Sequence, residues 1–576
     1  MRTRLLLLVV TLASGIAFLS RAGSAQTGNR APAPAALTGQ VTSAEEGPME
    51  GVLVTAKKIN STIAITVVSD AQGRYRFPAA KLEPGHYAIS IRAVGYDLES
   101  PAAPGVGSTL SPLSVDINTQ QVATADLKLR KTSNLSMQLT NAEWIESVPG
   151  TQEQKGSLRN CVTCHTLQRP IRSIHDADEF VEVQERMASY VNQSIPEAPQ
   201  SRLADRLAVQ QERGEEGGQS RLQQNRKRMA EFLSSINLSK DSTWTYPLKT
   251  FPRPKGRATH VIITEYDLPK PTRQPHDVIV DSDGMAWYIS FGEQILGKLD
   301  PKTGKTTEFP VPVLKPGSPI GELSLRPDQD GNPWVGMMYQ GAVAKFDRNT
   351  EKFQTWSFPP EDNKGYTQIN QTDPMHSKVD GKVWVQDAGT YSLRRLDLAT
   401  GKFGEVFQPF PEPSPNIYDV ISDSQNNAYF TVFGAGQIGR IDAKTGKITL
   451  YKTPTPNSAP RRGSMDSRGH LWFGEFRGNR IGMFDTETER FQEWVPPTPW
   501  AQPYDVVADK NGEAWAGSMF TDRVTRLDPK SGQMTDYLLP RSTNIRRVFV
   551  DNSTTPVTFW VGNDHGASII KLEPLD

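Results

Sequence analysis

An aromatic residue that recurs every 43 to 50 residues limits the possible folds of this chain more than any other feature. From Pro275 onward, each repeat contains an apolar strand, an Asp/Asn/Gly turn, an aromatic strand, a loop, a strand ending in an acidic residue and an aromatic strand. Four short strands in a unit of about 40–50 residues are typical of one blade of a β-propeller. Seven aromatic anchors predict seven blades: Trp287, Trp334, Trp384, Tyr429, Trp472, Trp515 and Trp560.

The last repeat stops at Leu572-Glu573-Pro574 and lacks its outer strand. A matching segment lies upstream, where Ile262–Pro269 is similar to the blade-ending Thr307–Pro310. Pairing of this segment with the last blade would close the ring and remove two exposed strand edges. The propeller is therefore expected over residues 257–576.

The first 25 residues have the pattern of a cleavable export signal. Arg2 and Arg4 precede an apolar run, Leu5–Phe18, and the small residues Gly23-Ser24-Ala25 form the expected cleavage site. The apolar run is too short to cross a bilayer by itself. We expect a periplasmic or secreted protein without a membrane span, in which an Ala/Pro-rich linker occupies residues 26–36.

Composition narrows the classes of partner. Lys and Arg together number 64, as do Asp and Glu, so the formal net charge is zero, which argues against nucleic acid as a partner. Two cysteines in 576 residues exclude a disulfide scaffold.

Residues 37–132 read as short β-type runs separated by turn residues, which predicts a small β-sandwich. The layout resembles the carboxypeptidase regulatory-like domain, a transthyretin-like sandwich. The resemblance rests on Gly39-Gln40-Val41, on Asp70 followed by Gly73-Arg74-Tyr75, and on Pro84-Gly85-His86-Tyr87. It implies a module without catalytic residues of its own, acting as a spacer or, alternatively, in carbohydrate contact.

Cys161-Val162-Thr163-Cys164-His165 is the sharpest chemical signal in the sequence. The C-x-x-C-H pattern attaches a c-type haem, because two thiols form thioethers with the vinyl groups and the adjacent imidazole ligates the iron. A redox C-x-x-C would need a thioredoxin-like context, which is absent. Zinc would need two further ligands, and the segment offers only His165 and His175. The motif predicts one covalent haem c with His165 as the proximal ligand.

The surrounding residues 141–246 have helical, charged patterns, with apolar faces over 176–191 and 226–236. This segment resembles a small class I cytochrome c domain. The resemblance implies a distal iron ligand, for which Met187 ranks first, His175 second and Met229 third.

Polar residues at the starts of the inner strands, and in loops on the same rim, are expected to converge at the mouth of the propeller channel. His276 and His565 are the candidate catalytic residues, with Asp277 and Asp564 as orienting partners, and this cluster is also the candidate site for a divalent metal. Arginine forks bind carboxylates, and tyrosines and aspartates bind hydroxyls, so the pocket is expected to take an anionic or polyhydroxylated ligand. The pocket residues are Asp277, Glu322, His376, Tyr418, Asp419, Arg461, Arg462, Glu475, Tyr504, Asp505, Arg546, Arg547 and Asp564.

The repeats are similar to those of the streptogramin (virginiamycin B) lyase family, clearest at Leu471–Glu475 and Gln437–Asp442. The resemblance implies a seven-bladed propeller and a lyase site in which a Glu-Pro-His turn and a second Glu hold magnesium and a general base. Pro275-His276 matches part of that turn, but Gln274 replaces its acidic ligand. The base is therefore expected, while the metal ligands are incomplete.

The sequence as a whole predicts a mainly β protein: an N-terminal transthyretin-like β-sandwich, a small all-α cytochrome c domain and a C-terminal seven-bladed β-propeller. The favoured function is electron transfer by the haem domain, with a redox partner protein, a small reductant or another substrate bound by the propeller, as in a haem-linked oxidoreductase. The alternatives are a carbon–oxygen lyase acting at the propeller mouth and a non-enzymatic carbohydrate- or protein-binding module with a redox haem.

Overall fold

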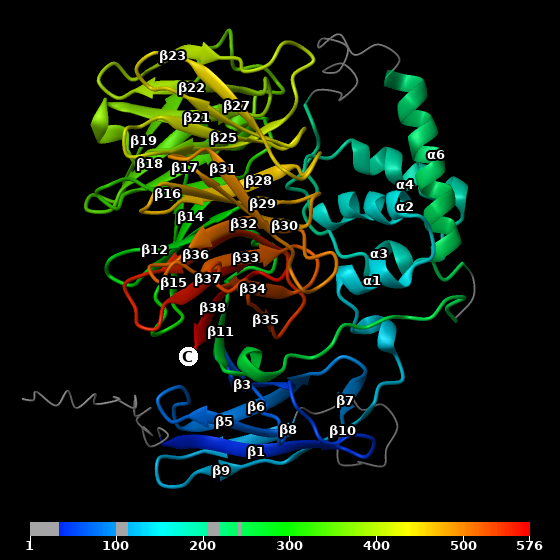
Figure 1. Cartoon of the computed structure of the whole chain (residues 1–576). Coiled ribbons are helices and arrows are strands. Elements are labelled where there is room, and N and C mark those ends of the chain that lie inside the picture. The colour runs from blue at the N-terminus through cyan, green and yellow to red at the C-terminus, as the bar shows by residue number, and fades with distance from the viewer. Residues whose placement is uncertain (1–33, 100–112, 204–217, 240–242) are drawn as a thin grey trace, which may run out of the picture. The chain divides into compact units, whose positions relative to one another are not determined.

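The structure is a computed structural model, and it describes residues 34–99, 113–203, 218–239 and 243–576 (Figure 1). The expected export signal, and the expected linker up to residue 33, lie outside the described residues. The described chain is mainly β, with a helical segment between two β regions. Within the described residues, no helix is long and apolar enough to cross a membrane.

The N-terminal region forms two sheets that enclose a common apolar core around Leu37, Val54 and Phe77. In the first sheet β1 pairs with β2, β5, β9 and β10, and β10 also pairs with β7; in the second, β3 lies between β4 and β6, and β6 pairs with β8. The strands are β1 (Ala35–Ser43), β2 (Gly47–Pro48), β3 (Leu53–Lys58), β4 (Ile63–Val68), β5 (Arg74–Pro78), β6 (Gly85–Arg92), β7 (Tyr96–Leu98), β8 (Leu113–Ile117), β9 (Ala123–Thr124) and β10 (Leu127–Lys131). The predicted sandwich is confirmed.

The helical segment begins with polar side chains that cap its helices. Thr140 and Glu143 form a capping box at the first helix, and Asp176 and Glu179 form another at the fourth. The helical elements are η1 (Leu135–Met137), α1 (Asn141–Ser147), α2 (Gln152–Ser157), η2 (Leu158–Thr163), α3 (Gln168–Ile171), α4 (Ala177–Ala188) and α6 (Gly218–Ile236). Both predicted helices are present, and the second starts earlier than the apolar pattern indicated.

A recurring hydrogen bond explains why the repeats carry an aromatic anchor. In the first blade the turn residue Asp281 accepts the backbone N–H groups of Asp283 and Met285, and its second oxygen accepts the indole N–H of Trp287 at 2.7 Å. The same pairing six residues apart recurs at Trp334, Trp472 and Trp515. Each aspartate thus closes the turn and fixes the buried ring that packs between blades.

Seven four-stranded meanders form the propeller, the last of them as one end of a larger sheet (Figure 1). The first blade consists of β12 (Pro275–Val280), β13 (Ala286–Ser290), β14 (Ile295–Leu299) and β15 (Thr306–Pro310), and the second of β16 (Ser324–Pro327), β17 (Pro333–Met337), β18 (Ala342–Asp347) and β19 (Lys352–Ser357). The third consists of β20 (Ile369–Asp373), β21 (Lys382–Asp387), β22 (Ser392–Asp397) and β23 (Lys402–Phe407), and the fourth of β24 (Ile417–Ser422), β25 (Ala428–Val432), β26 (Gln437–Ile441) and β27 (Ile448–Lys452). The last three are β28 (Pro460–Met465), β29 (His470–Glu475), β30 (Arg480–Asp485) and β31 (Arg490–Trp494); β32 (Pro503–Ala508), β33 (Ala514–Ser518), β34 (Arg523–Leu527) and β35 (Met534–Leu538); and β36 (Ile545–Asp551), β37 (Thr558–Asn563) and β38 (Ser568–Pro574) with β11 (Val261–Asp267). Short 3-10 turns accompany them at η3 (Gly256–Thr259), η4 (Met338–Gln340) and η5 (Ser377–Val379).

The predicted ring closure is confirmed. The upstream strand β11 runs antiparallel to β38, from the Val261–Pro574 pair to the Asp267–Ser568 pair, and so completes the seventh blade. In the neighbouring blade, the oxygen of Pro275 lies close to Gly562 of β37, where a Cβ atom would overlap it. The first and last blades are therefore in direct contact.

The structure also shows a connection that the sequence did not predict. The second edge of β11 pairs with β4 of the sandwich, with Ile262 opposite Val67 and Tyr266 opposite Ile63. The seventh blade and half of the sandwich therefore form one eight-stranded sheet, β36-β37-β38-β11-β4-β3-β6-β8. The sandwich therefore covers a strand edge of the propeller, a contact that the expected spacer role does not include.

Candidate functional site

The predicted haem motif, Cys161–His165, begins in a short 3-10 turn that ends at Thr163, and Cys164 caps that turn. Both cysteines are unpaired, and Cys161 packs against an apolar cluster that contains Tyr418 and Tyr504 of the propeller. Burial raises the pKa of Cys161 to about 12 and also raises the pKa of Cys164. Both side chains are therefore neutral thiols, the form that adds across a vinyl group.

His165 is oriented as a metal ligand. Its Nδ1 atom lies 2.9 Å from the backbone oxygen of Thr166, which assigns the ring proton to Nδ1 and leaves Nε2 as the acceptor nitrogen. Burial lowers the pKa of His165, so the ring is in the neutral form that binds metals. Two neutral thiols three residues apart and this imidazole form a donor set that fits a c-type haem.

Three side chains of the seventh blade hold the backbone of the motif. The Nδ2 atom of Asn544 donates to the oxygen of Val162 at 2.9 Å. Arg546 donates to the oxygen of Thr163 at 2.9 Å, and Nε2 of His565 lies 3.2 Å from the same oxygen. The haem motif is therefore bonded to the mouth of the propeller, a contact that the separate motifs did not indicate.

The three candidate distal ligands have different surroundings. The Sδ atom of Met229 accepts a hydrogen bond from Ser157 at 3.2 Å, and its side chain packs on the same apolar cluster as Cys161. Met187 is half-buried on α4 and is not among the described members of that cluster. His175 is half-buried, and its Nδ1 lies 3.4 Å from the carboxylate of Glu179. As the expected distal ligand, Met229 is favoured by these contacts over Met187, which the sequence analysis ranked first.

A buried hydrogen-bond chain runs along the mouth from His276. Its Nδ1 atom lies 2.5 Å from the carboxylate of Asp277, its Nε2 lies 3.3 Å from the hydroxyl of Tyr504, and that hydroxyl lies 2.6 Å from the hydroxyl of Tyr418. Burial lowers the pKa of His276 to about 3, so the ring is neutral. Although burial opposes its ionisation, the charge of Arg462 and the bond with His276 hold the pKa of Asp277 below its usual range.

His276 and His565 bond different partners among the described residues and do not form one catalytic cluster. His565 is bonded to the haem motif rather than to the chain from His276, and its Nδ1 is buried without a partner among the described residues. Asp564 pairs with Arg546 at 3.2 Å, and burial raises its pKa to about 6. In the described part of the chain, no group of three or more His, Cys, Asp or Glu side chains is placed to hold a metal ion.

Most of the predicted pocket arginines are neutralised inside the channel. Arg462 contacts both carboxylate oxygens of Asp277, at 3.0 and 3.1 Å, and Arg547 lies 3.8 Å from Asp505. Asp419 pairs at 2.8 Å with Arg326. Of the four predicted arginines, Arg461 alone has no carboxylate partner among the described residues.

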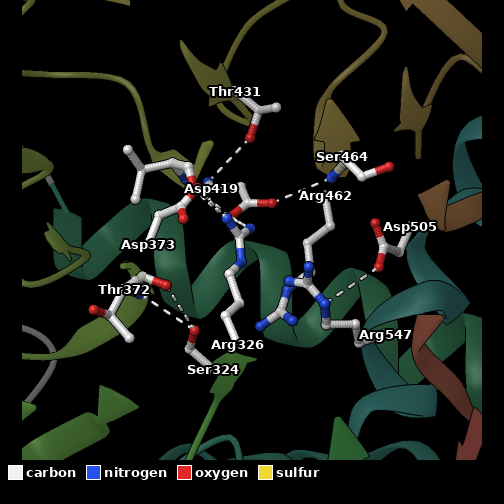
Figure 2. A network of polar contacts seen from close by, with 12 residues as sticks. Ser324, Arg326, Thr372, Asp373, Asp419, Thr431, Arg462, Ser464, Asp505 and Arg547 are labelled. Carbon is white, nitrogen blue, oxygen red and sulfur yellow. Dashed lines mark hydrogen bonds and ion pairs between the residues drawn. The ribbon is translucent and has the colours of Figure 1, made fainter. Parts of the chain in front are cut away.

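Sequence reasoning missed Arg326 and Asp373, which complete this network. Figure 2 shows the guanidinium of Arg326 directed at Asp419 and at Asp373, each 2.8 Å away. Arg326 stands in the inner strand of the second blade, where no other blade has an arginine at the matching position. That charge in an otherwise apolar inner strand is the signal that could have identified it.

His376 is not at the mouth, and its prediction was wrong. Its Pro374-Met375-His376 sequence imitates the start of an inner strand, but β20 starts at Ile369 and ends at Asp373. Strand starts lie at the mouth, so His376 follows the opposite end, where its ring bonds Ser422 at 2.8 Å.

Two predicted carboxyl groups are buried without described hydrogen-bond partners, Glu322 and Glu475. Burial raises the pKa of Glu322 well above its usual range. Burial, followed by the charge of Glu493, raises the pKa of Glu475 to about 8. Burial thus favours the neutral form of both groups, and Glu475, with a pKa of about 8, is mainly protonated at neutral pH.

The substitution Glu475→Gln should remove a pH dependence of stability. Between the ordinary pKa of 4.5 and about 8, the folded chain holds a proton that the unfolded chain has released. Stability therefore falls as the pH rises through this window, by about 1.4 kcal/mol per pH unit. Gln does not titrate, so urea unfolding at pH 5 and pH 8 should show a smaller loss in the variant. An equal loss in both proteins would contradict the assignment.

Comparisons with known proteins agree with the two β regions. The model of the carboxypeptidase regulatory-like domain matches residues 36–130, which confirms the resemblance seen in the sequence. No curated protein matches the chain. Virginiamycin B lyase from Staphylococcus aureus is similar to 54% of this chain over 99% of its own length, with 22% identity and a TM-score of 0.46. A streptogramin B lyase structure is similar to 55% of this chain over 99% of its own length, with 24% identity and a TM-score of 0.47.

Proposed function

We propose that this chain is an exported c-type haem protein in which Cys161 and Cys164 carry the haem and His165 ligates the iron. The haem supplies one-electron chemistry, and the propeller mouth binds the small reductant or redox partner. The observation that carries the proposal is the tautomer of His165: the bond of its Nδ1 to Thr166 leaves the lone pair on Nε2, in a motif whose two cysteines are unpaired. On this proposal the chain is a haem-linked oxidoreductase or electron carrier of the periplasm or exterior.

The mouth supplies a path for protons. Because Asp277 is ionised, the proton of the 2.5 Å contact belongs to Nδ1 of His276, and Nε2 accepts the hydroxyl of Tyr504. The hydroxyl oxygen of Tyr504 in turn accepts a hydrogen bond from the hydroxyl of Tyr418, which is the last group in this series of hydrogen bonds. A substrate that loses a proton when it loses an electron could deliver that proton to Tyr418, and His276, whose pKa is lowered by burial, would relay the proton and not store it.

The iron ligands can be tested by reduced-minus-oxidised spectroscopy of the haem-loaded protein. His165→Ala should change the absorption bands of both oxidation states, because it removes the proximal imidazole. His470→Ala should leave them unchanged, because His470 is bonded to Asp466 in a distant turn. Unchanged bands in His165→Ala would contradict the proposal.

The same spectra decide the distal ligand. Met229→Leu should change the bands and lower the reduction potential, because methionine ligation raises the potential of haem iron. Met187→Leu, which alters a residue outside the cluster around Cys161, should change neither. The reverse outcome would assign the ligand to Met187.

One observation favours a second function, a carbon–oxygen lyase at the mouth. A histidine bonded to a carboxylate, as in His276 and Asp277, has the arrangement of a general base that needs no metal, although burial lowers the pKa of this ring to about 3 and so weakens it as a base. A lyase would retain its turnover when the cysteines are replaced and no haem is attached. An oxidoreductase would lose all turnover in the same variant.

A further inference from the structure

Arg461 carries a positive charge that no carboxylate neutralises among the described residues. Its guanidinium stands among four aromatic rings, 3.9 Å from the ring centre of Tyr504, 4.5 Å from Phe476, 5.0 Å from Tyr418 and 5.2 Å from Phe433. Its polar contacts are the hydroxyl of Tyr418 at 3.3 Å and the sulfur of Met519 at 3.5 Å, while its Nε is buried without a partner. Aromatic faces stabilise such a cation but leave its N–H donors open to an anion.

Two more arginines are linked to this site, Arg477 through the ring of Phe433 and Arg159 through the charge of Arg477. Arg477 faces the ring of Phe433 at 5.4 Å, the same ring that faces Arg461. Arg159, two residues before Cys161, donates to the oxygen of Gly156, and burial together with the charge of Arg477 lowers its pKa. Neither side chain forms an ion pair within the part of the chain that the structure describes.

Arg477 shares a ring with Arg461 and lies close enough to Arg159 to lower its pKa, so the three like charges are unfavourable together; Arg461 and Arg159 are partly buried and Arg477 is exposed. Such an arrangement is unfavourable until an anion occupies it. The rings of Phe433, Tyr418 and Phe476 that surround Arg461 belong to the cluster on which Cys161 packs. A ligand attached at Cys161 and resting on that cluster would therefore place its acidic groups against these arginines.

We propose that Arg461 and Arg477 of the propeller, with Arg159 of the helical segment, bind the carboxylates of the haem attached at Cys161 and Cys164. This inference rests on the proposed function. It makes the propeller part of the haem site, because two of the three arginines come from β28 and from the turn after β29. The same chemistry would suit a soluble dicarboxylate, so the experiment separates the two sources.

The test compares haem-loaded wild-type protein with Arg461→Gln, Arg477→Gln and the double variant. Loss of cations beside the haem disfavours the reduced iron, so the equilibrium constant for reduction by a fixed mediator should fall about tenfold in each single variant and about a hundredfold in the double variant. A change of about tenfold per charge is the scale of the interaction between unit charges roughly 10 Å apart at an effective dielectric constant of about 20. Arg461→Lys should recover most of the loss because it keeps the charge, and the exposed Arg490→Gln on β31 of the same blade should have no effect.

An unchanged reduction equilibrium in the double variant would overturn the inference, since the haem would be present without its arginine partners. Succinate provides the second arm. If succinate shifts the haem spectrum of wild-type protein but not of the double variant, while reduction without succinate is equal in both, the site serves a soluble carboxylate and the inference also fails. A wild-type protein that carries no haem would instead overturn the proposed function.

Discussion

Ile262→Asp should separate the sandwich from the seventh blade and destabilise the whole chain. Ile262 lies in β11, buried in the core of the sandwich at 4% exposure, while its neighbour Ile263 packs in the core of the seventh blade. Truncating a buried isoleucine costs about 2–5 kcal/mol, and a buried charge without a partner adds to this cost. Loss of the β4–β11 ladder also exposes a strand edge, so much of the protein should be recovered as aggregate.

A matched control is available on the propeller surface. Val313 is 51% exposed in the loop before β16, so Val313→Asp introduces the same charge without burying it. Thermal unfolding and the soluble fraction of both variants measure the difference. Equal stability of Ile262→Asp and Val313→Asp would show that pairing with the sandwich does not stabilise the seventh blade.

Asp277→Ala should cause the largest loss of stability among substitutions in the channel. The carboxylate of Asp277 accepts hydrogen bonds from Arg462, from the ring of His276 and from the backbone N–H of Leu325, the last at 2.9 Å. Its removal leaves a fully buried guanidinium without a carboxylate and an inner strand without one of its hydrogen bonds. Breaking a buried ion pair in this way typically costs about 3–5 kcal/mol.

The control is an ion pair on the surface. Lys378 and Asp330 form a contact in which both side chains are more than half exposed, so Asp330→Ala should cost about 0–1 kcal/mol. The double variant Asp277→Leu/Arg462→Leu should be more stable than Asp277→Ala alone, because it leaves no unpaired charge. Denaturant unfolding of the four proteins tests both statements, and a surface-like effect of Asp277→Ala would refute the role assigned to the channel network.

The repeat architecture could be predicted because each blade is built by local rules. The hydrogen bond between Asp281 and the Trp287 indole spans six residues, and because it recurs in other blades, the blade period is visible in the sequence. The missing outer strand could be recovered in the same way, because Ile262–Pro269 has the pattern of a blade-ending strand.

Contacts between distant parts of the chain could not be predicted. Pairing of β4 with β11 depends on backbone groups at two strand edges, which carry no residue signature. The ion pairs of Arg462 with Asp277 join residues 185 positions apart, so a list of charged mouth residues could not show which charges cancel. Arg461 differs from Arg462 by one position, yet it remains the unpaired member because strand alternation directs the two side chains differently.

His376 shows the opposite error, in which a local pattern misleads. Pro374-Met375-His376 copies the composition of Pro275-His276-Asp277, but the strand that it was expected to begin had already ended. A motif of three residues does not fix which end of a strand it occupies. The neighbouring Asp373, which pairs with Arg326, is the residue that enters the channel network.

Covalent haem attachment tests the central claim most directly. The chain, exported together with a cytochrome c maturation system, should give a haem-stained band on a denaturing gel and an intact mass increased by one haem. Replacement of both cysteines, Cys161→Ala/Cys164→Ala, should abolish the stain and the added mass while the far-ultraviolet circular dichroism of the mainly β fold is retained. An unstained wild-type chain of unmodified mass, or haem that stays attached after both replacements, would contradict the account.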